Sequence, residues 1–426
     1  MPKPSSTSLY SRWREVAARR GHAIAVREFP SRRAWTFADL ERAGEDADPS
    51  PHVLQTSRSG MEFLIDVLRA WRDEAVLVPD EMGGTFYFDA SALPGGVCHV
   101  KVTSGSTGNR QGVMFDADAL AADAHQVIAT MGLREDLANI GVISLAHSYG
   151  FSNLVTPLLL FGIPLFLVDS PLPGLMRDAL KEETNSGVVL PAVPAMWRAW
   201  EQSGLDFTNV RVAISAGAPL PLELEQSISQ RTGLKIHNFY GSSECGGIAY
   251  DDGSAPRADA ALVGSAMQGV ALSVDEATGC LHVKSPAIGI GYLGAEEGFP
   301  AGGFLTQDVA EIRNGNVYLL ERTGDAIHVA GYKVAPRVIE DALLRVPGLR
   351  CCVVFGVPSA DPVRGEEVVA VISGSAPRAE LRSALAHLPT AYQPRHWWPN
   401  DDLTPDARGK ISRARWKSLW LARAAS

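Results

Sequence analysis

Four apolar runs rich in β-branched residues alternate with helix-like segments in the middle of the chain, and this alternation limits the possible folds more than any other feature. The runs cover residues 141–146, 162–168, 187–193 and 210–217. Helical spacing is found beside them at residues 176–183 and 222–232. Continuous apolar runs are typical of parallel strands that are buried on both faces and joined by helices. The sequence therefore predicts an α/β fold with a largely parallel sheet.

The pattern changes in the last third of the chain. Short strand candidates, separated by Gly and Asn turns, lie at residues 281–286, 308–313 and 316–321. Such spacing is typical of a small antiparallel β unit. A compact α+β pattern then begins at Thr323. We expect a large N-terminal α/β domain at residues 1–322 and a small mobile α+β domain at residues 323–426. Gly324 is the expected hinge, because glycine tolerates large changes in its backbone dihedrals.

Charge and cysteine usage exclude several classes of protein. The formal net charge is −9, from 39 Lys and Arg against 48 Asp and Glu, so a general affinity for nucleic acid is not expected. Five cysteines without a CxxC pair indicate neither a disulfide framework nor a zinc site. The basic N-terminus has no apolar core, and the most apolar stretch, residues 154–168, is too short for a bilayer. We expect a cytoplasmic protein with no membrane span and no nucleic-acid partner.

A loop rich in glycine and hydroxyl residues is the strongest local signal of a binding site. It occupies residues 102–113, between a strand-like and a helix-like segment. The residues that suit it to phosphate are Gly105, Gly108 and Gly112, with the hydroxyls of Ser104, Ser106 and Thr107. No lysine stands where a P-loop of the GxxxxGK[ST] type needs one. Taken alone, the loop fits a flexible surface turn about equally well.

Further motifs follow the glycine loop in a fixed order. They are residues 239–244 (FYGSSE), residues 303–308 ending in Asp308, residues 322–336 beginning with Arg322, and residues 403–413 with Lys410. Together with the loop, this series resembles the motifs of the adenylate-forming superfamily, which includes acyl- and aryl-CoA ligases, adenylation domains of peptide synthetases, and luciferases. The resemblance runs from about Thr36 to Arg413. Five motifs in the right order are far more specific than any one of them.

The resemblance implies a ligase reaction with two steps. A carboxylate attacks the α-phosphate of ATP and gives an acyl-adenylate and pyrophosphate; a thiol then attacks the mixed anhydride. The implied cofactors are ATP and Mg²⁺, and the thiol belongs to CoA or to the phosphopantetheine of an acyl carrier protein. The first step brings anions together, so the site needs hydrogen-bond donors, cations and a metal ion.

The resemblance also assigns residues to the nucleotide. The β- and γ-phosphates are assigned to Thr103, Ser104, Gly105, Ser106, Thr107 and Gly108. Tyr240 and Gly217 border the adenine, Asp308 accepts hydrogen bonds from the ribose, and Arg322 reaches the ribose or a phosphate. Asp308 and Arg322 also fit a structural ion pair.

Four residues are assigned to the chemistry by the same resemblance. Lys410 bridges the substrate carboxylate and the α-phosphate, Glu244 holds Mg²⁺, and Ser243 donates to the α-phosphate. His147 stands in AHSYGF, where the family often has a histidine near the acyl carboxylate. The alternatives are an exposed lysine in a basic tail for Lys410, a surface carboxylate for Glu244 and a core histidine for His147.

Two departures from the family pattern matter for function. The glycine loop usually ends in Pro-Lys-Gly, but here Gln111 replaces the lysine, and Arg110 is the nearest cation that could compensate. The chain is also short, since only 102 residues precede Thr103. The missing material comes mainly from the first lobe, so the active centre is expected to survive.

The acyl pocket is expected between residues 147–151, 192–197, 215–217 and 240–247. Phe151, Met196 and Trp197 make it apolar, which favours a fatty or aromatic acid, with a slight preference for an aromatic or short unsaturated one. Two other classes stay open: a non-catalytic nucleotide- or acyl-binding relative, and a luciferase-like oxygenase. Retention of Glu244 and Lys410, together with Asp308 and Arg322, favours the ligase.

Overall fold

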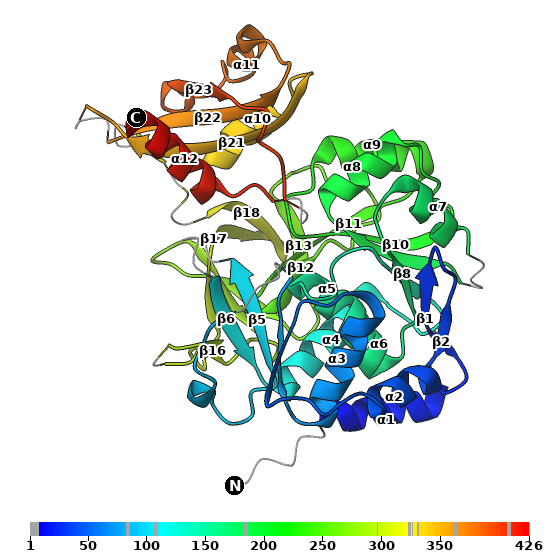
Figure 1. Ribbon diagram of the computed structural model, residues 1–426. Coiled ribbons are helices and arrows are strands. Elements are labelled where there is room, and N and C mark those ends of the chain that lie inside the picture. The colour runs from blue at the N-terminus through cyan, green and yellow to red at the C-terminus, as the bar shows by residue number, and fades with distance from the viewer. Residues whose placement is uncertain are drawn as a thin grey trace.

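A sheet of thirteen strands is the largest element of the protein (Figure 1). The computed structural model describes residues 8–81, 86–104, 110–182, 186–295, 297–322, 325, 327–329, 332–361, 365–406 and 410–425. The strand order of the large sheet is β14-β15-β17-β18-β13-β12-β11-β10-β9-β7-β8-β1-β2. One half of this sheet is parallel and the other half is antiparallel, and the two halves meet where β11 pairs with β12.

The parallel half confirms the predicted α/β fold. Its strands are β1 (Ile24–Phe29), β8 (Leu165–Val168), β7 (Ala138–Gly141), β9 (Val188–Ala192), β10 (Val210–Ser215) and β11 (Ile236–Ser242). The short strand β2 (Ala34–Thr36) adds an antiparallel edge. Nearly every residue of β7, β8 and β9 is buried, because helices cover both faces of the sheet.

Two groups of helices cover these faces. On one face lie α7 (Pro173–Leu180), α8 (Pro194–Gln202) and α9 (Leu222–Thr232). On the other lie α1 (Leu9–Arg20), α2 (Phe37–Glu45), α3 (Gly60–Arg72), α4 (Ala117–Met131) and α6 (Thr156–Phe161). The chain enters α6 through the short helix α5 (Ser148–Gly150) and a π-helical turn, Phe151–Val155. Within the described residues, no helix combines the length and apolarity that a membrane crossing requires.

One predicted strand is displaced in the structure. We expect a strand at residues 141–146, but β7 ends at Gly141 and the following residues form the loop that leads to His147. Ile143 and Leu145 are nevertheless buried. Their apolar character therefore reflects packing of the loop into the core, which the sequence pattern alone does not separate from strand pairing.

The antiparallel half continues the large sheet instead of forming a separate one. It contains β12 (Gly246–Tyr250), β13 (Leu262–Ala266), β14 (Ala271–Val274), β15 (Cys280–Lys284), β17 (Phe304–Arg313) and β18 (Asn316–Arg322). A second sheet has the order β16-β6-β5-β4-β3. Its strands are β3 (Val53–Thr56), β4 (Val76–Pro79), β5 (His99–Ser104), β6 (Arg110–Phe115) and β16 (Gly291–Tyr292). Helix α4 directly follows β6 and contacts β12, so it lies between the two sheets.

The last hundred residues gather at one end of the molecule (Figure 1). They contain β19 (Ile327–Val329), β20 (Tyr332–Val334), α10 (Pro336–Leu343), β21 (Leu349–Pro358), β22 (Glu366–Gly374), α11 (Arg378–Ala384), β23 (His396–Pro399) and α12 (Arg413–Ala425). Alternate residues of β21 and β22 pack on α10 and α11 on one face, and on Leu403 and Trp416 on the other. This segment touches the rest of the chain where Arg337 Nη2 donates to Ala260 O at 3.2 Å.

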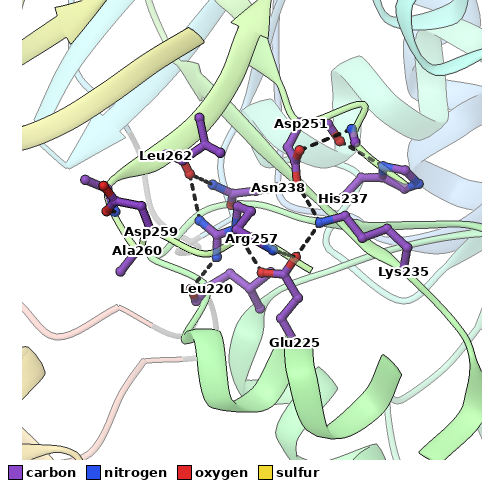
Figure 2. Close-up of polar contacts among 12 residues, drawn as sticks. Leu220, Glu225, Lys235, His237, Asn238, Asp251, Arg257, Asp259, Ala260 and Leu262 are labelled. Atoms are coloured by element: carbon purple, nitrogen blue, oxygen red, sulfur yellow. Dashed lines mark hydrogen bonds and ion pairs between the residues drawn. The ribbon is translucent and has the colours of Figure 1, made fainter. Parts of the chain in front are cut away.

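A buried cluster of charges holds the beginning of β11 (Figure 2). Glu225 of α9 is fully buried and pairs with Lys235, directly before β11, and with Arg257, whose Nε lies 2.9 Å from Glu225 Oε2. Lys235 Nζ also donates to Asp251 Oδ2 at 2.6 Å. Arg257 completes the cluster by donating to the carbonyls of Leu220 and Leu262, both at 2.7 Å. These bonds hold the beginning of β11, at the end of the strand that lies away from Tyr240.

Candidate functional site

The glycine loop connects the paired strands β5 and β6. Thr103 lies opposite Gln111 in this pair, and Ser104 lies opposite Arg110. Gly105, Ser106, Thr107 and Gly108 lie outside the described residues, as does the side chain of Ser104. The register brings the two ends of the loop together, and the phosphate contacts of its residues stay a prediction.

Arg110 is already engaged in the structure. Its Nη2 lies 2.5 Å from Oδ1 of the buried Asp80, and its guanidinium lies 5.5 Å from the ring centroid of Phe86. A guanidinium held by a carboxylate has much of its charge neutralised. The geometry therefore gives no support to the expectation that Arg110 compensates for Gln111.

Ser243 and Glu244 occupy the tight turn between β11 and β12. Gly241 and Gly247 lie opposite each other below the turn, and a Cβ on Gly241 would lie only 2.6 Å from Gly246 O, so this close approach requires glycine. The main-chain oxygen of Glu244 accepts from Gly289 N at 2.8 Å. The carboxylate Oε1 accepts from Tyr292 Oη at 2.9 Å. The turn thus fixes both the backbone and the side chain of Glu244.

The segment that follows His147 reaches the same turn. Ser148 Oγ lies 3.2 Å from Ser243 Oγ. His147 caps α5, and its Nδ1 accepts from Tyr149 N at 3.2 Å, so a neutral imidazole carries its proton on Nε2. The π-helical turn comes directly after α5, and such turns are frequent at functional sites. His147 therefore directly precedes a residue that contacts Ser243, although 95 residues separate Ser148 from Ser243.

Tyr240 and Asp308 form a second pair at the site. Tyr240 Oη donates to Asp308 Oδ2 at 2.6 Å, although 68 residues separate them. Burial raises the pKa of Tyr240 well above its usual value, and the charge of Asp308 acts in the same direction, so the phenol stays protonated and donates. Arg322 lies opposite Asp308 in the register of β17 and β18. The side chain of Arg322 lies outside the described residues, so the structural ion pair and the ribose role both stay predictions.

Gly217 follows β10 at the same edge of the sheet as Tyr240. Its φ of +83° is one that glycine adopts at low cost. Two residues earlier, Ser215 is fully buried, and its Oγ has no hydrogen-bond partner among the described residues. The Ser215 hydroxyl is therefore available to form a hydrogen bond with a ligand bound at this end of the strand.

Lys410 belongs to the C-terminal segment. Its main-chain oxygen accepts from Asp406 N at 2.8 Å, and its N donates to Asp406 Oδ1 at 2.9 Å. Arg413, three residues later, donates to both carboxylate oxygens of Glu340 at 2.8 and 3.0 Å, and it also pairs with Asp325. Gly324, the expected hinge, lies outside the described residues, and Arg413 links the lysine turn to Asp325, which directly follows it in sequence. The action of Lys410 at the nucleotide stays a prediction.

Two residues expected to line the acyl pocket are core residues. Trp197 is fully buried against Trp200 and Phe207, and its Nε1 donates to Ile214 O. Phe151 is 1% exposed, and its ring lies 4.4 Å from that of His99. Both side chains support the sheet from within, so the prediction that they line the pocket is wrong. Met196, the third residue expected there, is partly exposed.

Sequence reasoning missed Tyr292, the partner of Glu244. The signal available to find it was the Gly289-Ile-Gly-Tyr292 run, in which glycines allow close approach of the backbone. In the structure Gly289 and Tyr292 hold the main chain and the carboxylate of Glu244 respectively. The described residues contain no group of three or more His, Cys, Asp or Glu that could form a metal cage. One carboxylate fits Mg²⁺, which takes its other ligands from phosphates and water.

Comparison with known proteins identifies the family. The profile of the AMP-binding enzyme family matches residues 66–293, more than half of the chain. A long-chain-fatty-acid–CoA ligase of Bacillus subtilis is 27% identical over 74% of this chain and 60% of its own length. A feruloyl-CoA synthase of Amycolatopsis is 29% identical over 65% of this chain and 59% of its own. The chain thus spans about three fifths of the length of these curated relatives.

Solved structures share the fold. ATP-bound MatB from Rhodopseudomonas palustris superposes with a TM-score of 0.84 at 22% identity, covering 97% of this chain and 98% of that one. The anthranilate CoA ligase AuaEII, in complex with anthranoyl-AMP, gives a TM-score of 0.83 at 16% identity, with coverage of 100% and 99%. The family match extends from α3 to β16 and so contains the turn around Glu244. On this match, the protein belongs to the AMP-binding enzyme family.

Proposed function

We propose that the protein is an AMP-forming acid–thiol ligase, which activates a carboxylic acid with ATP and passes the acyl group to a thiol. The observation that carries the proposal is the convergence of distant motifs on the β11–β12 turn. Ser148 reaches Ser243, Tyr292 reaches Glu244, and Tyr240 reaches Asp308. The curated relatives named above are CoA ligases of a fatty acid and of ferulate, which supports this reaction class.

The nucleotide is proposed to lie across the ends of β5, β10 and β11. Its β- and γ-phosphates meet Thr103 and the rest of the glycine loop through Gly108, where hydroxyls and backbone N–H groups act as donors. Gly217 and Tyr240 border the adenine. Asp308 and Arg322 hold the ribose, and the bond from Tyr240 orients the Asp308 carboxylate for that purpose.

Glu244 is proposed to hold Mg²⁺, which when bound neutralises charge on the phosphates. The bond from Tyr292 leaves one carboxylate oxygen of Glu244 for the ion. Ser243 donates to the α-phosphate as an oxygen of the acid attacks the phosphorus and pyrophosphate leaves. His147 lies beside the incoming carboxylate, and Lys410 bridges that carboxylate and the α-phosphate, where negative charge accumulates.

The thiol step is proposed to follow rotation of residues 323–426 against residues 1–322 about Gly324. Arg413 ties the Lys410 turn to Asp325, so the lysine moves together with the hinge region. The acceptor is CoA or the phosphopantetheine of an acyl carrier protein. A fatty or aromatic acid fits the named relatives. Five unpaired cysteines fit a reducing, cytoplasmic compartment.

Exchange of labelled pyrophosphate into ATP tests the proposal. With a panel of fatty, aromatic and short unsaturated acids, at least one acid is expected to support exchange in the presence of Mg²⁺. Release of AMP with CoA, or with a phosphopantetheinyl carrier protein, then identifies the acceptor. The second candidate is a non-catalytic nucleotide binder, which the uncharged Gln111 and the engaged Arg110 favour. MgATP binding without exchange for any acid would establish that candidate instead.

Tyr240→Phe tests the proposed ribose clamp. The variant removes the hydroxyl that orients Asp308, and hydrogen bonds to charged groups contribute more than neutral ones. We expect MgATP affinity to fall about tenfold, with little loss of thermal stability. Calorimetric titration with MgATP measures the change. Tyr318→Phe on β18 is the matched control and is expected to bind like the wild type; equal affinity of both variants would contradict the clamp.

A further inference from the structure

The strand that leads into the glycine loop carries three polar side chains on one face, and two of them are buried. His99, Lys101 and Thr103 alternate along β5 and therefore point to one face of the sheet. His99 is 1% exposed and Lys101 is 3% exposed. In the register, Lys101 lies opposite Val113, which in turn lies opposite Tyr292. This face is therefore the one that presents Tyr292 to Glu244.

Lys101 is a buried cation with few partners. Its Nζ lies 3.8 Å from Asp123 Oδ2 and 4.3 Å from the ring centroid of Phe115, and it has no hydrogen-bond partner among the described residues. Burial lowers the pKa of Lys101, while the charge of Asp123 opposes this effect. Burying a lysine here is costly, so an apolar residue would be expected unless the charge had a use.

Asp123 of α4 joins this lysine to two other parts of the site. Its Oδ1 accepts from Gly247 N at 3.0 Å, just after the turn that carries Glu244. Its Oδ2 accepts from Ser152 Oγ in the π-helical turn that follows His147. Gly246 adopts a φ of +69°, and a Cβ there would lie 2.2 Å from Asp123 Oδ1. The backbone at Gly246 therefore packs directly against this carboxylate, with no room for a side chain between them.

We propose that the Lys101–Asp123 pair positions the nucleotide site by holding three segments in register: the strand before the glycine loop, the Ser243–Glu244 turn and the segment after His147. The inference rests on the proposed function, because it assigns the pair a role in binding MgATP. Asp123 suits this role because a carboxylate accepts from several donors at once and also pairs with a cation. Lys101 and Asp123 are each 3% exposed, so the proposed role is exerted through other groups and both are positioning residues.

A second buried lysine provides the comparison that separates positioning from general stability. Lys235 is 9% exposed and pairs with Glu225 and Asp251 at the beginning of β11 (Figure 2). It belongs to the charge cluster at the opposite end of the strand from Tyr240. Lys235→Met therefore removes a buried ammonium of the same kind without touching Asp123.

The test compares Lys101→Met, Asp123→Asn and Lys235→Met by thermal unfolding and by calorimetric titration with MgATP. All three are expected to lower the melting temperature. Only Lys101→Met and Asp123→Asn are expected to weaken MgATP binding, by about tenfold or more. The double variant Lys101→Met/Asp123→Asn leaves no unpaired charge, and its amide oxygen still accepts from Gly247 N. We expect it to bind MgATP about as weakly as the single variants, because each of them already breaks the pair that holds the segments; recovery of wild-type affinity would contradict the inference.

Ser152→Ala keeps the test decisive if a single variant does not fold. It removes only the hydroxyl that donates to Asp123 and is expected to weaken MgATP binding about threefold. The inference is overturned if the folded variants at Lys101, Asp123 and Ser152 bind MgATP like the wild type. It is also overturned if Lys235→Met weakens binding equally, since the effect is then one of stability. A wild-type protein that does not bind MgATP would instead refute the proposed function.

Discussion

Lys410→Ala is expected to reduce acid-dependent exchange of pyrophosphate into ATP by about 10²–10³-fold. The ammonium is proposed to counter charge that develops only as the carboxylate attacks the α-phosphate. Interactions made only in the transition state affect the rate without contributing to substrate binding. MgATP affinity is therefore expected to stay within about twofold of the wild type. Exchange kinetics and calorimetric titration on the same preparation measure both quantities.

Lys417→Ala is the matched control for this experiment. Lys417 lies on α12 in the same segment, and its Nζ is 3.8 Å from Glu366 Oε1, so the variant also removes a partly exposed ammonium. It is expected to exchange pyrophosphate at the wild-type rate. Lys410→Arg keeps the charge but changes its reach and geometry, and we expect it to recover only part of the rate. Wild-type exchange by Lys410→Ala would refute the assigned role.

Arg257→Met is expected to lower the free energy of unfolding by about 3–5 kcal/mol. The substitution leaves the fully buried Glu225 with Lys235 as its remaining cation. It also removes the Arg257 donor to Leu220 O and one of the two side-chain donors to Leu262 O, which keeps its bond from Asn238. Removing one member of a buried charged network is costly, because the other groups cannot return to water. Urea unfolding followed by tryptophan fluorescence measures the change, with the wild type as reference.

Arg313→Met provides the contrasting case. Arg313 pairs with Glu311 on β17, but both side chains are about half exposed, so solvent screens their attraction. We expect its urea midpoint to match that of the wild type. If Arg257→Met also unfolds at the wild-type midpoint, the cluster at the beginning of β11 does not stabilise the fold. Apolar packing alone would then hold β11 in place.

Much of the fold could be predicted from local sequence. The apolar runs at residues 162–168, 187–193 and 210–217 contain β8, β9 and β10, because strands buried on both faces are formed mostly by apolar residues. The helix expected at 222–232 coincides with α9. The run at 141–146 failed as a strand, since a loop packed into the core carries the same apolar signature.

The candidate site was predicted less completely. Motif order pointed to Glu244 and Asp308, but not to Tyr292 or Tyr240 as the side chains that hold them. Phe151 and Trp197 were expected at the acyl pocket, and the structure buries both in the core. Spacing along the chain shows which residues share a face of an element, but not whether that face packs into the core or lines a pocket. An aromatic residue near a motif therefore serves equally well as a pocket wall or as core.

Local sequence patterns were sufficient to predict most of the elements and the chemistry of the candidate residues, because strand burial, turn formation and the supply of donors depend on residues close together in the chain. Tertiary structure alone decided which of these groups meet. Lys101, Asp123 and Gly247 come from separate segments of the chain. Only the packing of α4 between the two sheets brings the Asp123 carboxylate to both the Lys101 ammonium and the Gly247 N–H. Long-range pairing of this kind is fixed by the topology of the whole sheet and by the exclusion of water from it, which local patterns do not contain.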